Sequence, residues 1–262
     1  MTRYKRVQKK IQKYEKIISK SRIKLKRKLY KLKNFVLRIG ISTKEDFELS
    51  EPLKANISFP CHLGIIFIGK FNLNLFQEIK MNLEQKFDSF FFHIYNLGKF
   101  KFPKDVYRKG IKKELRIIRN ISEVLELHPT NKIYQLLIDL LKINNLDMIL
   151  AITDLPLYSS SNNNIIFLFG EAHIKHKCCV VSSLKLKEEY YYKAKDKDLL
   201  KFRLIKETTH ELGHLILGPE HCENISCVMT FSREIEGIDK KSIRFCNNCY
   251  EKLINFREMF NF

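Results

Sequence analysis

The sequence has no apolar run long enough to cross a membrane. A spanning helix needs about 20 mostly apolar residues, whereas the apolar stretch at residues 55–69 has 15 residues and contains Pro60 and His62. Lys or Arg recurs every few residues as far as Arg38, which leaves no room for the apolar core of a signal peptide. We therefore expect neither a membrane span nor a secretory leader.

The cysteines do not form the pattern of a secreted disulfide framework. There are seven, an odd number, and four of them fall in the last 41 residues. Secreted scaffolds carry an even number that can pair, whereas cytosolic cysteines more often bind metal. We expect a cytoplasmic protein. Cys178 and Cys179 are adjacent in an expected strand, so they should face opposite sides, with one of them buried.

Acidic residues are nearly absent from the first 40 positions. Residues 1–40, the N-terminal arm, hold 16 Lys and Arg and one acid, Glu15, and so carry +15 of the net charge of +19. Apolar residues recur in three- and four-residue steps between Tyr4 and Val36, which predicts one long helix. Its basic face either contacts an anionic polymer or surface or remains solvated.

The rest of the chain is a nearly neutral body of ordinary globular composition. Ser42, Thr43, an acidic cluster and two prolines predict a linker over 41–62, followed by a single domain over 63–262. Hydrophobic patterning predicts strands at 63–69, 90–95, 147–153, 165–170 and 179–183. It predicts helices at 72–87, 114–127, 133–143 and 198–217, with a turn at His128 and Pro129. This alternation is typical of an α/β fold.

The last of these helices carries a metal-binding pattern, HELGH. His210 and His214 are four residues apart and therefore share one face of the helix, where both imidazoles can reach one metal ion. Glu211 projects beside them and can deprotonate a metal-bound water.

A second pattern follows within a short segment. Four cysteines are spaced in two pairs, as in a closed tetrahedral zinc site: Cys222, Cys227, Cys246 and Cys249. His221 directly precedes the first of them. One segment thus serves two metals, which core packing does not explain.

The run HELGHLILGPEHC…CVMTFS…FCNNC resembles the archaemetzincins, metzincin-type zinc peptidases. The resemblance covers roughly residues 63–256 and is strongest over 147–250. It implies a mixed, mostly parallel sheet, an active-site helix and a C-terminal subdomain stabilised by a four-cysteine zinc site. Residues near 114–127 look like an insertion.

The resemblance implies two zinc ions. The ligands of the catalytic zinc would be His210, His214 and His221, with Glu211 as general base and acid. Met229 would lie under this zinc in a Met-turn, although a buried gap-filling role is also open. The ligands of the structural zinc would be Cys222, Cys227, Cys246 and Cys249.

Two spacings depart from the family pattern. Three residues, not two, separate His214 from Gly218, and 16 rather than 17 separate Met229 from Cys246. If the family spacing is counted forward from His214, Glu220 falls at the position of the third zinc ligand. If it is counted backward from Cys222, His221 falls there. We prefer His221, because glycine at 218 can adopt the positive φ that ends a helix. We expect a π-type turn to absorb the extra residue.

These features predict a monomeric zinc-dependent peptidase in which Glu211 activates a zinc-bound water to hydrolyse peptide bonds. An extended peptide substrate should add as a strand beside residues 165–170, and His173 and His176 are candidates for substrate contact. The alternative is a non-catalytic zinc-stabilised binding module whose arm contacts nucleic acid or the ribosome. The residues do not separate endopeptidase from aminopeptidase activity.

Overall fold

The computed structural model describes residues 59–69, 71, 75–101, 108–111, 124–161, 168–260 and 262. The helix predicted for the N-terminal arm, the linker up to residue 58 and the first part, 165–167, of the strand predicted at 165–170 lie outside these residues. The rest of that predicted strand is wrong at 168–169, where the chain is not extended strand, and a strand begins only at Gly170. None of the helices that the structure describes is both long and apolar enough to span a bilayer.

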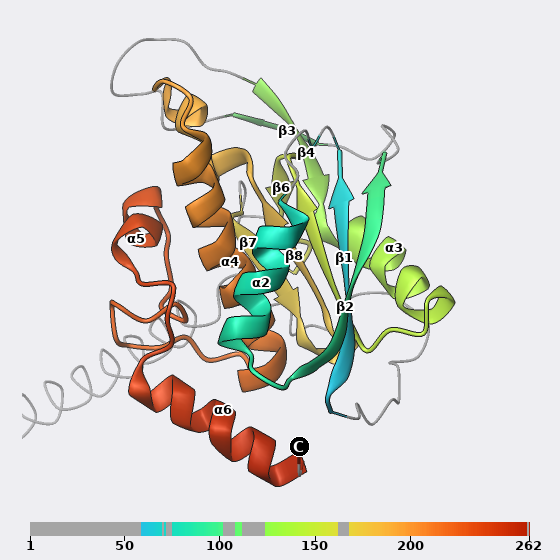
Figure 1. Ribbon diagram of the computed structural model, residues 1–262. Coiled ribbons are helices and arrows are strands. Elements are labelled where there is room, and N and C mark those ends of the chain that lie inside the picture. The colour runs from blue at the N-terminus through green and yellow to red at the C-terminus, as the bar shows by residue number, and fades with distance from the viewer. Residues whose placement is uncertain are drawn as a thin grey trace, which may run out of the picture. The chain divides into compact units, whose positions relative to one another are not determined.

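A five-stranded sheet forms the centre of the body (Figure 1). Its order is β2 (Phe91–Phe100), β1 (Cys61–Ile68), β5 (Met148–Thr153), β8 (Cys178–Ser182) and β7 (Gly170–His173). The first four strands are parallel, and β7 pairs antiparallel with β8 at one edge. The predicted mostly parallel sheet of an α/β fold is confirmed.

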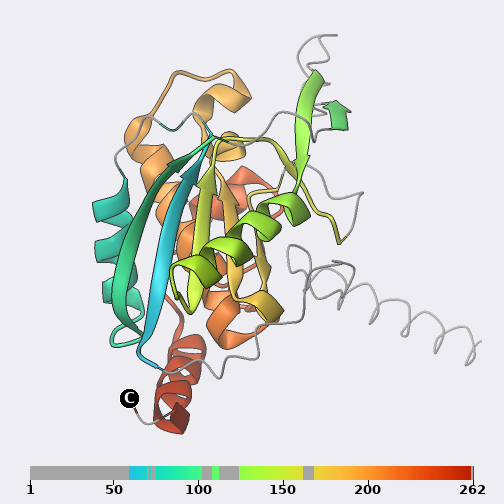
Figure 2. The ribbon, with the colours of Figure 1, turned by 90° about the vertical axis from the view of Figure 1, so that its right-hand side faces the viewer.

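Helices cover both faces of this sheet (Figure 2). One face packs on α3 (Thr130–Ile143), and the other on α2 (Phe76–Lys86) and α4 (Lys197–Leu217). Cys178 and Cys179 face opposite sides of the sheet as expected, but both are fully buried and not one of them, because each lies in one of the two apolar layers.

A small second sheet corrects another prediction. It consists of β3 (Arg108–Ile111), β4 (Val124–Pro129) and β6 (Leu157–Tyr158). The end of the helix predicted at 114–127 is strand β4, and His128 and Pro129 pair with β6 instead of forming a turn. Helix α3 begins directly afterwards, at Thr130.

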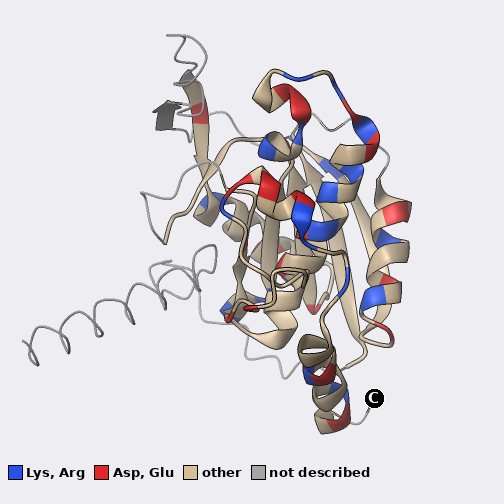
Figure 3. Cartoon of the chain, turned by 90° about the vertical axis from the view of Figure 1, so that its left-hand side faces the viewer, with Lys and Arg blue, Asp and Glu red and all other residues tan. Residues whose placement is uncertain are grey.

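Short elements connect the sheet to the C-terminal part. The 3-10 helices η2 (Ile174–His176), η3 (Leu184–Leu186) and η4 (Glu188–Tyr191) follow β7 and β8, and α5 (Ile235–Lys240) and α6 (Asn247–Phe260) follow α4. Basic residues and Glu occur in equal numbers along α2 and along α6 (Figure 3). This mixture agrees with the nearly neutral body that the charge count predicts.

Candidate metal centre

Helix α4 carries the HELGH motif and ends at Gly218, as predicted from the ability of glycine to adopt a positive φ. Asp196 caps its start by accepting a hydrogen bond from the Leu199 amide at 2.8 Å. The 21-residue helix stays α-helical to Leu217, so the expected π-type turn is wrong; the extra residue simply lengthens the α-helix. The chain leaves the helix at Gly218, whose φ of 95° is open to glycine at little cost.

Three histidines converge at the end of this helix. The ligand nitrogens of His210, His214 and His221 lie within 4.8 Å of one another, and the two helical Nε2 atoms are 3.1 Å apart. Zn–N bonds of about 2.0–2.1 Å in a tetrahedral site imply N–N separations of roughly 3.4 Å. Among the described residues this group contains His221 and not Glu220, the arrangement that the glycine argument favours.

Main-chain carbonyls fix the orientation of the two helical imidazoles. Nδ1 of His210 lies 2.8 Å from the Val228 carbonyl, and Nδ1 of His214 lies 2.9 Å from the Gly218 carbonyl. A carbonyl only accepts, so each Nδ1 carries the proton and each Nε2 offers a lone pair to the shared position. Burial, with the nearby His221, lowers the pKa of His214 to about 3, which keeps its imidazole neutral. The donor set therefore fits a zinc ion.

Glu211 lies in the same buried region. It is 4% exposed, and burial raises its pKa well above the usual range, with a further contribution from Glu207. Glu207, one turn earlier, forms a buried ion pair with Lys241 at 2.6 Å, and the positive charge of Lys241 favours ionised Glu211. No short-range spacing links Glu207 to Lys241, so this pair could not be predicted from the sequence.

Met229 packs against the turn of α4 that carries Gly213. It is 1% exposed, and a Cβ placed on Gly213 would overlap its thioether. Gly213, the fourth residue of HELGH, therefore lets the Met229 side chain approach the helix between His210 and His214.

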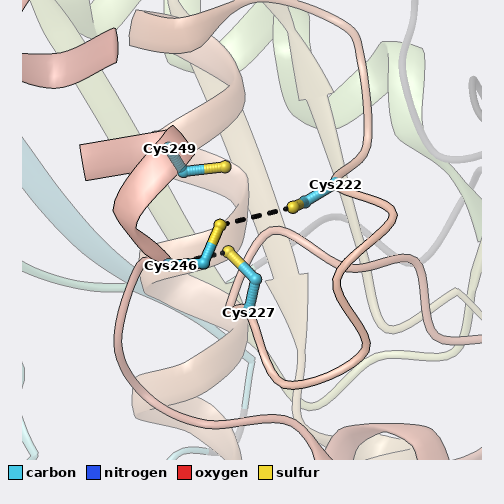
Figure 4. A group of neighbouring side chains, drawn as sticks. All are labelled: Cys222, Cys227, Cys246 and Cys249. Atoms are coloured by element: carbon cyan, nitrogen blue, oxygen red, sulfur yellow. Dashed lines mark hydrogen bonds between the residues drawn. The ribbon is translucent and has the colours of Figure 1, made fainter. Parts of the chain in front are cut away.

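The four cysteines form a second group (Figure 4). Their Sγ atoms lie within 4.8 Å of one another, and those of Cys222 and Cys246 are 3.6 Å apart. Zn–S bonds of about 2.3 Å in a tetrahedron imply S–S separations of roughly 3.8 Å, whereas a disulfide requires about 2.0 Å. The group therefore fits a four-thiolate zinc site.

The two groups share one stretch of backbone. His221 and Cys222 are consecutive, and the Cys222 amide donates to the Met229 carbonyl at 2.9 Å. Cys227 immediately precedes Val228, whose carbonyl orients His210. Two cysteines are thus covalent neighbours of groups that build the histidine site.

The structure does not favour His173 or His176 as a substrate contact. Both side chains are buried, at 1% and 5% exposure. His173 stacks edge-on against Tyr134 of α3, so it lies on the face of the sheet opposite α4.

Comparison with known proteins then identifies the family. The model of peptidase family M54 matches residues 63–255. This chain belongs to peptidase family M54. The archaemetzincin of Methanocaldococcus jannaschii is 42% identical over 107 residues, which are 41% of this chain and 58% of that protein. The archaemetzincin of Pyrococcus furiosus is 43% identical over 105 residues, 40% of this chain and 53% of that protein. The chain thus spans less than two thirds of these relatives' length.

Solved structures show the same fold for this M54 chain. An archaemetzincin from Methanopyrus kandleri aligns with a TM-score of 0.54 and 25% identity, covering 76% of this chain and 96% of that one. A zinc-dependent peptidase from Methanocorpusculum labreanum aligns with a TM-score of 0.57 and 24% identity, covering 73% of this chain and 99% of that one.

Proposed function

We propose that this M54 chain is a zinc-dependent peptidase with a catalytic and a structural zinc ion. The observation that carries the proposal is the convergence of the three imidazoles of His210, His214 and His221 beside Glu211, a buried glutamate on the helix that carries the first two. His210, His214 and His221 would hold the catalytic ion. The structural ion would be held by Cys222, Cys227, Cys246 and Cys249.

The chain's own residues supply the rest of the chemistry. The zinc ion that His210, His214 and His221 would hold would supply Lewis acidity and lower the pKa of water at its open position. Glu211 accepts the proton of the attacking water and later passes it to the leaving amine. The carbonyls of Val228 and Gly218 hold the imidazoles in the tautomer that this requires. Met229 supports the helical turn from below.

The substrate would be an extended peptide. Strand β7 is the last strand of the described sheet, and Gly170 at its start faces Glu211. A peptide that adds as a strand beside this edge would present its carbonyl near the base. Residues 165–167, where the sequence predicts the same contact, lie outside the described part of the chain.

The decisive variant is Glu211→Gln. It should keep the fold and both zinc ions but lower turnover of a diverse peptide pool by at least about 100-fold, the usual scale for a general base. Zinc is counted in both proteins. Unchanged turnover in a contaminant-free preparation would exclude Glu211 as the general base. Absence of turnover by the wild-type protein, with both zinc ions bound, would instead favour the non-catalytic zinc-stabilised binding module.

Two further variants test the third ligand in the same experiment. His221→Ala should release the more weakly held zinc, whereas Glu220→Ala should retain it, because only His221 belongs to the histidine group. The reverse result would assign the third position to Glu220.

A further inference from the structure

We propose that Gly170 is a positioning residue for Glu211: the missing side chain at the start of β7 is the space that the glutamate carboxylate occupies. This inference rests on the proposed role of Glu211 as general base. It assigns a part in the reaction to a residue outside the metal-binding motif, 41 positions earlier in the chain.

The contact is between the edge strand and the base itself. A Cβ on Gly170 would overlap Oε1 of Glu211 and lie 2.7 Å from its Cγ and 2.8 Å from its Cδ. Carbon atoms in contact are normally about 3.5–4.0 Å apart. All the nearest atoms that such a Cβ would meet belong to Glu211.

The backbone of Gly170 does not itself require glycine. Its φ lies outside the positive range, unlike those of Gly69, Gly98 and Gly218. Alanine can therefore adopt the same conformation, and the cost of a methyl group at this position comes from the Glu211 side chain.

The backbones of β7 and α4 cannot easily move away from each other. Gly170 pairs with Val181 of β8, and the Ser182 amide donates to the Phe169 carbonyl at 2.7 Å, which holds the start of β7. On the other side, α4 is fixed one turn earlier by the Glu207–Lys241 ion pair. The flexible element between these two is the Glu211 carboxylate, so an added methyl group displaces the carboxylate.

Displacement of the carboxylate would act on catalysis and not on metal binding. A reacting group misplaced by about 1 Å can cost on the order of 100-fold in rate. The imidazoles of His210 and His214 are oriented by carbonyls from other segments, so they keep their positions.

The test compares Gly170→Ala with Ala172→Gly. Ala172 is buried two residues further along β7, in the apolar layer on the α4 side of the sheet, and this control also changes one methyl group. Gly170→Ala should lower kcat about 10- to 100-fold with little change in KM, in far-UV circular dichroism or in the content of two zinc ions. Ala172→Gly should retain kcat.

A double-mutant cycle separates positioning from a structural role. In the Glu211→Gln background, Gly170→Ala should cause no further loss of kcat, because the group it acts through has already lost its function. An additive loss, a loss of zinc or a loss of fold in Gly170→Ala would overturn the inference. Full activity of Gly170→Ala beside an inactive Glu211→Gln would also overturn it and leave the peptidase proposal intact. An active Glu211→Gln would instead defeat the proposed function.

Discussion

At the scale of single residues, α4 keeps its charged side chains inside the protein by pairing them. Arg203 binds Glu188 at 2.7 Å and Asp239 at 2.6 Å, and Lys206 donates to the carbonyls of Ile238 and Asp239. Buried charges are tolerated only when they are paired and hydrogen-bonded. Helix α5 and the residues beside it therefore act as the polar partner that lets the metal-binding helix be buried.

Glu171, on the other face of β7, gives the fold a pH dependence. Burial raises the pKa of its carboxyl from 4.5 to about 7, although the hydroxyls of Ser159, Thr130 and Tyr134 favour the charged form. The pKa of Glu171 is higher in the folded protein than in the unfolded chain, so below the unfolded pKa of 4.5 the neutral carboxyl carries no burial penalty. The free energy of unfolding falls as the pH rises from there through about 7, because the carboxyl ionises inside the protein. At roughly 1.4 kcal/mol per unit of pKa, the loss approaches about 3 kcal/mol.

Replacing Glu171 by Gln should remove this dependence. Urea unfolding of the zinc-loaded protein at about pH 5 and about pH 8 should show a smaller fall in the free energy of unfolding for Glu171→Gln than for wild type. Glu126→Gln, which changes an exposed carboxylate on β4, is the matched control. Parallel pH profiles for wild type and Glu171→Gln would contradict the assignment.

At the scale of elements, local patterns predicted strands β1, β2, β5 and β8 and helix α4, because these segments carry a strong period and clear ends. The edge strand β7 was not predicted in its place, because it begins where the strand expected at 165–170 ends. The helix predicted at 114–127 is wrong over 124–127, which belong to strand β4. This strand is specified by its pairing with β3 and β6. Pairing between distant segments overrides local preference.

The same limit applies to the candidate site. HELGH, His221 and the four cysteines lie within 40 residues. Spacing predicted the pair His210 and His214 and the four-cysteine group, and the resemblance to the archaemetzincins added His221. Gly170 and Lys241 could not be found in this way. Their roles depend on how β7 and the chain after α5 approach α4 in the folded protein.

The end of α4 gives the prediction at this scale. Gly218 has φ 95° and ψ −174°, a conformation that is essentially restricted to glycine, and no atom lies within 4 Å of a Cβ placed there. Gly218→Ala should therefore lower stability by roughly 1–3 kcal/mol through backbone strain alone. It should also weaken zinc binding at the histidine site, because the Gly218 carbonyl orients His214.

Gly98→Ala is the control. Gly98 has φ 80° and is equally open around its Cβ, but it lies in β2, on the other edge of the sheet. Both variants should lose stability in thermal melts, while only Gly218→Ala should lose affinity for zinc. Equal zinc affinity in the two variants would show that the Gly218 carbonyl does not control zinc binding at the histidine site.

At the scale of the whole molecule, the two proposed zinc ions should leave in a defined order. A closed four-thiolate site is coupled to folding and resists mild chelation, whereas three imidazoles leave the other ion open to a competing ligand. Titration with a chelator, followed by zinc release, activity and circular dichroism, should show activity disappearing with the first ion. Loss of the fold together with the first ion would contradict this order. The function of the N-terminal arm, which lies outside the described residues, stays a prediction.

The backbone shared by residues 221–229 has a thermodynamic consequence. If filling the cysteine site orders His221 and the Val228 carbonyl, it raises the affinity of the histidine site by some factor. By linkage, filling the histidine site must then raise the affinity of the cysteine site by the same factor. The protein would thus respond to the free concentration of zinc more steeply than two independent sites allow, and the proposed peptidase activity would depend cooperatively on the supply of zinc.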